Sequence, residues 1–523
     1  MELLNHRSTR SLDGGTPILP PLRFHDQYVS FVNHSIVKVP EPKRHIHVKY
    51  ALLLLDLDGL RPVVEHLYSP NMGTFAKAPE DMLRSLLAMI LCRVFSIDDW
   101  VDMMRTEPFY AIISGFDPDN VPGVGTFFLF IDRLLGLTDN PPKHLRKPRP
   151  KSRDTKSQSK DKNKDTVKHQ DIINRLANRI MKAGKALKRD DWALDPSAKY
   201  HRFEIVLKEI FYTIFLPKSV ELGLIDIAKL YVTADSTKLS TYANPHGKRI
   251  CSCPKGKPCG CKRRYQDISA RWGWDSYREC FVYGHSLYEL CTYSLDHTVQ
   301  LPLVISIFDA NRHDSVLGLA AMHEAIDKLH LPIKVATFDK ASDALGFYRL
   351  GYEHWDVALV IALNERNKGH FTYQPAKLDE HGTPYCAADE PMLYWGHCYD
   401  RKRLKWRCPR KAKKKTAKTC EHECDCSRSP YGRVVYTYPK TNYRLFTPIP
   451  RGSELWENHY DHHSASERSH KRKKWDYGLR QTRTAGRERI FLRAMLMAMA
   501  QHVEAWAALA ARKERLSQLS LAA

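Results

Sequence analysis

Two aspartates follow segments with the composition of buried β-strands. Asp235 follows residues 230–234, Leu-Tyr-Val-Thr-Ala, and Asp339 follows residues 333–338, Ile-Lys-Val-Ala-Thr-Phe. If both end neighbouring strands of one open sheet, their carboxylates converge on one cleft. They then repel each other unless a cation lies between them, and Mg²⁺ or Mn²⁺ prefers such oxygen ligands. The alternative is a turn or capping role, which is the commoner one for a single aspartate.

A third acidic residue from a later helix would complete a site for two divalent ions about 3.5–4 Å apart. One ion would generate an attacking hydroxide or 3′-alkoxide, and the other would stabilise the leaving oxygen. Phosphoryl transfer of this kind needs positioning and charge neutralisation, so no Ser or Cys nucleophile need be sought.

The elements that must position these aspartates predict a mixed α/β fold. Short segments rich in β-branched residues recur at 230–234, 280–290, 301–308, 333–338 and 357–363, and a helix is expected at 315–329. A meander followed by a helical crossover indicates a mixed sheet with helices packed on it.

Helical periodicity dominates on both sides of these strands. Apolar residues recur at helical spacing between about 45 and 138, and helices are expected again at 170–229, 461–477 and 486–516. Residues 141–168 are rich in Pro, Ser and Lys, which predicts a mobile basic linker that could also bind phosphates. Residues 365–450 have few long apolar runs and indicate an insertion.

Size and charge narrow the class of protein. A chain of 523 residues is too long for one compact core. Its 82 Lys and Arg against 59 Asp and Glu give a net charge of +23, which favours nucleic acid as a partner over a merely basic soluble protein. The N-terminus lacks the apolar run of a signal peptide, and the most apolar segments are too short or too polar to span a membrane. We therefore expect a soluble protein in a reducing compartment, with no membrane partner.

The 13 cysteines favour metal binding over disulfides in such a compartment. One tight loop holds four of them, which would enclose a tetrahedral Zn²⁺: Cys251, Cys253, Cys259 and Cys261. A looser second group either binds a second zinc ion or is unpaired: Cys408, Cys420, Cys424 and Cys426. Four protein ligands leave no open position for a substrate, so both sites would be structural.

Basic and aromatic side chains lie close to the first cysteine group. Lys262 and Arg263 would direct positive charge toward DNA. Trp272, Trp274 and Tyr277 could stack on unpaired bases, but we expect them to pack in the core, which is the commoner fate of such aromatics.

The order of these features resembles the insertion-sequence DDE transposases. Their ribonuclease-H-like catalytic domain carries its first two aspartates on the first and fourth strands, places that Asp235 and Asp339 match. Shorter fragments agree, among them His313-Asp-Ser before the crossover helix and Asp339-Lys-Ala-Ser-Asp. The likeness extends from about residue 230 to residue 506, with a gap at the insertion.

In one large branch of that family the catalytic Glu lies in a helical pattern: Tyr, two residues, Arg, three residues, Glu, six residues, Lys. Tyr460, Glu467 and Lys474 fit this spacing, and His463 replaces the Arg. The resemblance implies that Tyr460, His463 and Lys474 contact DNA, a protonated His substituting in part for Arg. Lys471 and Arg472 are adjacent alternatives to Lys474.

The resemblance also implies a domain organisation. It predicts an N-terminal all-helical DNA-binding domain at 1–140 and a basic linker at 141–170. The ribonuclease-H-like core would begin at 171–364, a mixed sheet flanked by helices. A zinc-bearing insertion at 365–450 would precede the Glu helix and C-terminal helix at 451–523.

The implied activity is DNA transposition. Asp235, Asp339 and Glu467 would hold two Mg²⁺ or Mn²⁺ ions, cut double-stranded DNA at the ends of a mobile element, and transfer the freed 3′ hydroxyl to a target strand. A homodimer on DNA is expected, in the bacterial cytoplasm and associated with the nucleoid. Two alternatives stay open: a ribonuclease-H-like nuclease that does not join strands, and a transposase-derived zinc protein that binds DNA without cutting.

Overall fold

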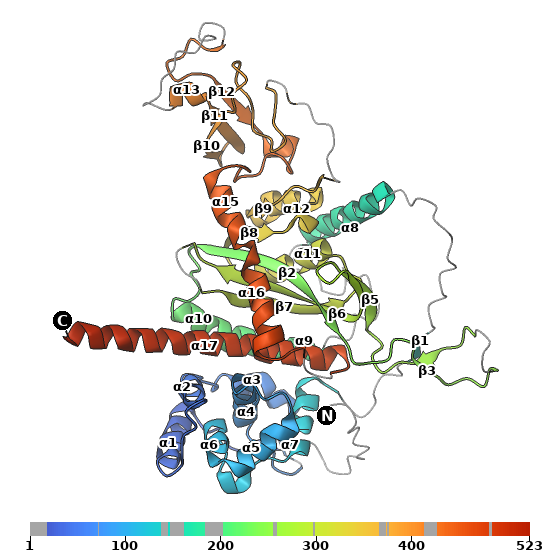
Figure 1. Cartoon of the computed structure of the whole chain (residues 1–523), viewed down its shortest axis with the longest axis vertical. Helices are drawn as coiled ribbons and strands as arrows, with labels where there is room; N and C mark the ends of the chain where they lie inside the picture. Colours follow the sequence, from blue (N-terminus) through green and yellow to red (C-terminus); the bar gives the residue numbers. More distant parts are fainter. Residues whose placement is uncertain are drawn as a thin grey trace.

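The computed structural model describes residues 18–71, 73–137, 145–146, 162–183, 202–254, 259–295, 299–365, 373, 376–412, 426–480 and 484–522. The described chain is a mixed α/β protein, which confirms the class predicted from the sequence (Figure 1). Within these residues, no helix is both long enough and apolar enough to cross a membrane.

A mixed six-stranded sheet forms the centre of the molecule. Its strands are β2 (Leu230–Ser240), β5 (Arg271–Asp275), β6 (Cys280–Tyr293), β7 (Leu301–Asp309), β8 (Ile333–Phe338) and β9 (Ala358–Ile361). The order is β5-β6-β2-β8-β9, and β7 also pairs with β6. The first three long strands are antiparallel neighbours, whereas β2, β8 and β9 run parallel. The expected meander and helical crossover are therefore both present.

The two faces of the sheet are covered differently. One face packs against α8 (Lys162–Ala183), α11 (Asp314–His323) and α12 (Leu345–Leu350), through buried residues such as Val232, Tyr288 and Val304. The other face carries Leu287, Ile305 and Ile307 and meets α16 (Ala465–Lys471) and α17 (Arg487–Ala522) (Figure 1).

Helix α8 begins inside the segment predicted to be a linker at 141–170. Its apolar residues Ile173, Leu176 and Ile180 are buried, and the helix packs against α11 and α12, so an apolar stripe holds it in place. The polar residues before that stripe continue the same helix back to Lys162. Residues 147–161 of the predicted linker lie outside the described residues.

The N-terminal helices share a core with the C-terminal helix. They are α1 (His25–Ile36), α2 (Ile46–Leu53), α3 (Leu60–Val64), α4 (Pro79–Leu91), α5 (Ile97–Thr106), α6 (Pro108–Ser114) and α7 (Val124–Leu134). Helix α17 lies between them and β7, and its buried face joins α9 (Arg202–Ile210) and α4 in one hydrophobic cluster. The short α10 (Leu216–Glu221) also contacts α17.

The segment predicted as an insertion forms a small antiparallel sheet with its own core. It contains β10 (Leu393–Cys398), β11 (Arg403–Arg407), β12 (Val434–Thr437) and the short α13 (Pro409–Ala412). Leu404, Trp406, Val435 and Phe446 are buried together there. Helix α15 (Glu454–Tyr460) then leads the chain back toward the main sheet (Figure 1).

Arg444 joins the base of this insertion to the loop after β8. Its guanidinium donates to both carboxylate oxygens of Asp343 at 2.6–3.0 Å, and also to the carbonyl of Asn364. Asp343 is four positions after Asp339 and its side chain is fully buried. The insertion is thereby held to the loop that carries the second candidate aspartate.

Candidate active site

The register of two parallel strands sets Asp235 and Asp339 side by side. The last pair between β2 and β8 is Thr233 with Thr337. Two positions farther along, Asp235 within β2 and Asp339 just after the end of β8 stand at the same level. Neighbouring strands lie about 4.7–4.9 Å apart, and paired residues point to the same face. The two carboxylates predicted from the sequence therefore share one face and one level of the sheet.

The sequence predicted that Asp235 ends its strand, but the strand continues beyond it. Strand β2 continues to Ser240 because β6 pairs with it along that whole length, whereas β8 stops at Phe338. Asp339 does follow the end of β8, and its carboxylate accepts a hydrogen bond from the Ala341 N–H at 3.2 Å. The prediction of a strand end was therefore wrong for Asp235 and correct for Asp339.

Burial and the charges of nearby carboxylates raise the pKa of both carboxyls. The pKa of Asp339 is raised to about 7 by burial and by the charges of Asp235 and Asp314. The pKa of Asp235 is raised to about 6 by burial, with Asp314 and Glu467 adding to the rise and His470 opposing it. Such a cluster binds protons or a cation, because neither carboxylate is neutralised by a direct ion pair within the described residues.

Asp314 is an acidic residue of this cluster that the sequence reasoning did not assign to the site. It begins α11, and its carboxylate accepts a hydrogen bond from the Ser236 hydroxyl, one residue beyond Asp235. The fragment His313-Asp-Ser was the only hint of this residue in the sequence. A single sequence does not show that the start of α11 lies next to β2. The structure thus adds a fourth acid to the three predicted.

Glu467 lies on α16, which crosses the same face of the sheet. The helix contacts β2 and β6, and the exposed carboxylate of Glu467 is close enough to raise the pKa of Asp235. Within the described residues, three or more metal-binding side chains have all their ligand atoms within 4.8 Å only in the cysteine group described below. The ligand atoms of Asp235, Asp339 and Glu467 are therefore not all within 4.8 Å of one another.

A buried polar network fixes α16 on the sheet. Lys473, just beyond the helix, places its Nζ 2.6 Å from Oε1 of Glu289, and the Ser469 hydroxyl donates to the same oxygen at 2.6 Å. Gln501 of α17 accepts from both Lys473 and Ser469. Burial opposes ionisation of Glu289, yet Lys473 and His470 hold the pKa of its carboxyl well below the usual range.

His470 connects this network to the first aspartate. Its Nδ1 lies 3.3 Å from Glu289 Oε2, and its Nε2 lies 3.2 Å from the backbone oxygen of Asp235. Glu289 is also the cross-strand partner of Asp235. His470 therefore contacts both β2 and β6, and it lies about one helical turn after Glu467 on α16.

No family model and no curated protein matches this chain.

Three predicted DNA contacts lie on the side of α16 near the carboxylates. Tyr460 stacks on His463 with ring centroids 4.8 Å apart. Burial and the nearby Asp339 raise the pKa of Tyr460, and His463 in turn lowers the pKa of Asp339 against the effect of burial. Burial and the cation of Arg278 lower the pKa of Lys474 to about 8, and the charge of Asp235 opposes that shift.

Lys471 and Arg472 face another part of the surface. With His462 and Arg468 they line an open groove between the β6–β7 connection, α16 and α17. Arg472 is ion-paired with Glu504 of α17 and donates to the hydroxyl of Tyr477. Among the adjacent alternatives considered, Lys474 is thus the one near Asp235.

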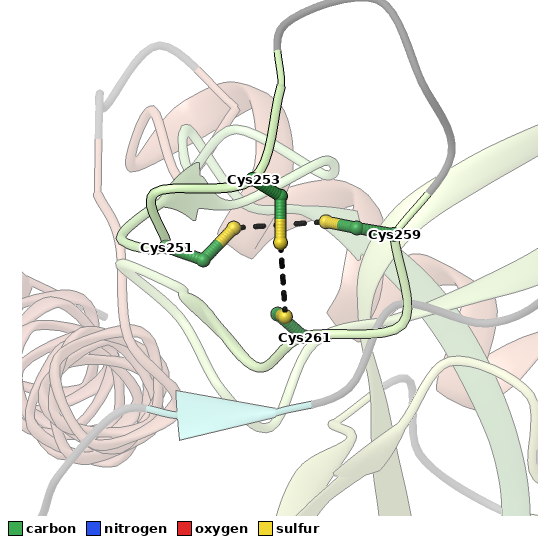
Figure 2. Close-up of side chains that lie close together, drawn as sticks. All are labelled: Cys251, Cys253, Cys259 and Cys261. Atoms are coloured by element: carbon green, nitrogen blue, oxygen red, sulfur yellow. Dashed lines mark hydrogen bonds between the residues drawn. The ribbon is translucent and has the colours of Figure 1, made fainter.

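The first cysteine group forms a compact cluster between β3 (Lys248–Arg249) and β4 (Arg263–Arg264). Strand β4 pairs with β3 on one side and with β1 (Leu145–Arg146) on the other. Figure 2 shows the four thiols of Cys251, Cys253, Cys259 and Cys261 turned toward one another. The Sγ atoms of Cys251 and Cys259 are 3.6 Å apart, as are those of Cys253 and Cys261. Thiolates around a tetrahedral Zn²⁺, with Zn–S near 2.3 Å, would be separated by about 3.8 Å. The cluster therefore has the ligands and spacing to bind zinc.

The electrostatics of these thiols also suit a cation. A backbone hydrogen bond from Cys253 and the side chain of Arg249 lower the pKa of Cys251 to about 6. Hydrogen bonding and charge from Cys253 raise the pKa of Cys261 to about 11. The neighbouring thiols thus oppose ionisation of Cys261, an effect that a bound divalent ion would reverse.

The second cysteine group is only partly described. Cys408 is buried at the end of β11 and Cys426 is partly exposed, whereas Cys420 and Cys424 lie outside the described residues.

The side chains beside the first cluster are accessible. Lys262 is exposed, and Arg263 donates to the carbonyl of His246. The expectation that the nearby aromatics pack in the core was wrong, because Trp272, Trp274 and Tyr277 are 48%, 49% and 95% exposed. Trp272 and Trp274 lie on one face of the β5–β6 hairpin, and Tyr277 lies in its turn.

Proposed function

We propose that this chain is a DNA transposase of the DDE kind with a ribonuclease-H-like catalytic core. The observation that carries the proposal is the equal level of Asp235 and Asp339 on adjacent parallel strands, with α16 anchored across the same face. Leaving aside β5, β2 and β8 are the first and fourth strands of the main sheet, the positions occupied by the aspartates of that family. The raised pKa values of both carboxyls support a site that is completed by cations.

Asp235, Asp339 and Glu467 would hold two Mg²⁺ or Mn²⁺ ions, with Asp314 adding negative charge beside them. The ions would supply an activated oxygen nucleophile and charge for the leaving oxygen. Lys474 and His463 lie on the same side and would bind the phosphates that flank the scissile bond. The chain's own task is to position DNA and to exclude competing geometries.

The proposed reaction has two balanced steps. In the first, water attacks a phosphorus at the element end; the bond to the 3′ oxygen breaks, leaving a 3′ hydroxyl and a 5′ phosphate. In the second, that 3′ hydroxyl attacks a target phosphodiester; a new phosphodiester forms and the displaced target oxygen leaves with the proton. No oxidant or external energy source is needed, because the first step is a hydrolysis and the second replaces one phosphodiester by another.

The accessory parts fit the same proposal. The net charge of +23 favours double-stranded DNA as partner, both element ends and target. The N-terminal helices would contribute to DNA binding, and the zinc cluster would stiffen the basic β3–β4 hairpin. Two element ends would be held by a homodimer, in the bacterial cytoplasm and on the nucleoid.

A strand-transfer assay tests the proposal. Wild-type protein, Mg²⁺ and duplexes carrying the element ends should give nicked ends and products joined to target DNA. Asp235→Asn, which keeps the side-chain shape, should retain DNA binding and lose both products. Cutting without joining would favour the nuclease alternative, and full activity of Asp235→Asn would refute the metal site. Binding without any cutting by the wild type would favour the retired, zinc-containing DNA-binding protein.

A further inference from the structure

The β5–β6 hairpin carries a ladder of aromatic rings on one face. Trp272 pairs across the strands with Tyr283, and Trp274 pairs with Phe281. The ring centroids of Trp274 and Phe281 are 5.1 Å apart, and those of Trp272 and Tyr283 are 5.4 Å apart. Phe281 is 66% exposed. Large rings with one face open to solvent are uncommon on a soluble protein unless they contact a partner.

The opposite face of the hairpin is pressed onto the protein. A Cβ on Gly273 would lie 2.0 Å from the carbonyl oxygen of Ala310, and one on Gly284 would lie 2.0 Å from that of Leu239. Only glycine allows backbones to approach so closely at these two positions. The ladder is therefore a platform fixed to the β7–α11 connection, the segment that leads to Asp314.

Cations surround one edge of the platform. Arg278 lies in the hairpin turn and its guanidinium is 3.8 Å from Asp275. Arg278 and Arg480 both act electrostatically on Lys474, so the three cations are close together. Arg480 also lies 4.6 Å from the ring of Trp475, which is 58% exposed. Flat aromatic surface beside fixed positive charge is the combination that binds single nucleic-acid strands.

The platform belongs to the same sheet as the carboxylates. Asp235 is paired with Glu289 on β6, and Phe281 lies eight positions back along that strand. At about 3.3 Å per residue this separation is roughly 26 Å. A DNA strand held by the carboxylates can reach the platform within several nucleotides.

We propose that the aromatic face of Trp272, Trp274 and Phe281 binds unpaired nucleobases of the DNA strand that the candidate active site engages. The inference rests on the proposed function for the identity of that strand, but the binding itself does not depend on catalysis. Stacking tolerates any base, because every base has a π-face, and the adjacent cations neutralise the backbone. Frayed or displaced DNA next to the cut would thus be captured and kept from re-pairing.

A second copy of the chain is a weaker candidate for this surface. The exposed parts of these three rings amount to roughly 250–400 Å², and a stable protein interface covers about 800 Å² on each partner. Two copies would also bring together the same cluster of Arg278, Lys474 and Arg480, whose charges repel. A polyanion meets that edge with favourable charge.

The test is equilibrium binding without added divalent ions, so that no cutting occurs. The probe is a fluorescent single strand of about 12 nucleotides that contains 2-aminopurine, and the comparison is a duplex of the same sequence. Trp274→Ala with Phe281→Ala should weaken single-strand binding by about 5- to 150-fold and change duplex binding little. Trp274→Phe should recover most of the affinity, and Tyr399→Ala, at an exposed ring 70% accessible in the insertion, should have no effect.

Three outcomes would overturn the inference. Equal loss on single strand and duplex would indicate general charge or folding effects, which thermal unfolding of each variant would reveal. Unchanged single-strand affinity of the double variant would show that the platform does not bind unpaired nucleobases. A change in sedimentation of the free protein, with DNA binding intact, would identify a second copy as the occupant.

The same measurements separate this inference from the proposed function. If wild-type protein cuts no DNA yet the double variant loses single-strand binding, the platform stands and the transposase proposal fails. If Asp235→Asn abolishes cutting while the double variant binds single strands as the wild type does, the transposase proposal stands and the platform inference fails.

Discussion

Lys473 Nζ lies 2.6 Å from Glu289 Oε1, and neither side chain is exposed to solvent. This pair joins the end of the Glu467 helix to the middle of β6, across from Asp235. A buried ion pair is a poor source of stability, because desolvation offsets most of its attraction. Its value here is orientation, since it fixes which turn of the helix faces the aspartates.

Removing one partner of this ion pair should lower the free energy of unfolding, whereas replacing both partners by apolar residues should not. Glu289→Ala leaves a buried, unpaired ammonium, so the free energy of unfolding should fall by about 3–5 kcal/mol. Replacing both residues, Glu289→Leu with Lys473→Met, should restore most of that loss while leaving the helix less firmly oriented. Urea unfolding measures the first effect, and strand cleavage by fully folded protein measures the second.

A second, partly buried ion pair serves as the control. Lys208 binds Glu324 at 2.6 Å on the opposite side of the sheet from α16. Lys208→Met with Glu324→Leu should change stability to a similar degree and leave cleavage intact. Equal cleavage by both double variants would show that the Glu289 network does not position Glu467.

Asp314 should set the pH at which the site works. Its charge raises the pKa of both Asp235 and Asp339, so Asp314→Asn should lower both values and move the acid limb of the cleavage profile to lower pH. The same change should weaken Mn²⁺ binding, because a negative charge is lost beside the ions. Mn²⁺ titration and the pH–rate profile measure the two effects, and Asp102→Asn, on an exposed face of α5, should alter neither. A profile that stays in place would exclude electrostatic coupling of Asp314 to the pair.

The two aspartates should make stability depend on pH and on Mg²⁺ together. Their folded-state pKa values, about 6 for Asp235 and about 7 for Asp339, exceed the unfolded value near 3.9. Between about pH 4 and pH 7 the folded chain therefore holds more protons, and its stability falls as the pH rises through this window. Excess Mg²⁺ binds the charged forms, so it should raise the Tm more at about pH 8 than at about pH 5. Asp235→Asn should reduce this difference; an equal Mg²⁺ effect at both pH values would contradict the assignment.

Local patterns in the sequence were enough to predict the strands and one of the two aspartate positions. Short β-branched segments around a helix predicted the mixed sheet, and Asp339 follows β8 because the parallel pairing ends there. The continuation of β2 beyond Asp235 depends on its pairing with β6, a partner about fifty residues away. Strand length is then decided by a long-range partner and not by the local residues.

Long-range packing also explains the other differences. Glu289 and Lys473 are 184 positions apart, and neither has a local feature that reveals the buried pair. The alternation of Trp272 and Trp274 around Gly273 is the local signal for their exposure. Alternation places both rings on one face, but only the close approach of Gly273 to Ala310 determines that this face points outward.

Zinc content should report on the first cysteine cluster separately from the second. Protein purified without chelators should lose about one zinc ion per chain in the double variant Cys253→Ser with Cys261→Ser, because a tetrahedral site does not survive the loss of two thiolates. Zinc is measured by atomic absorption or by a chromogenic chelator after thiol modification. Cys280→Ser, at an exposed free thiol on β6, should leave the zinc content unchanged.

Loss of that ion should disorder the hairpin and spare the sheet. The β3–β4 pairing spans only two residues on each strand, so it depends on the metal for its rigidity. The double variant should therefore show faster proteolysis near Lys262 and weaker DNA binding, with a Tm of the main unfolding transition close to that of the wild type. Equal zinc content in the wild type and the double variant would show that these four thiols do not hold the ion. A large fall in Tm would instead assign the cluster to the folding of the core.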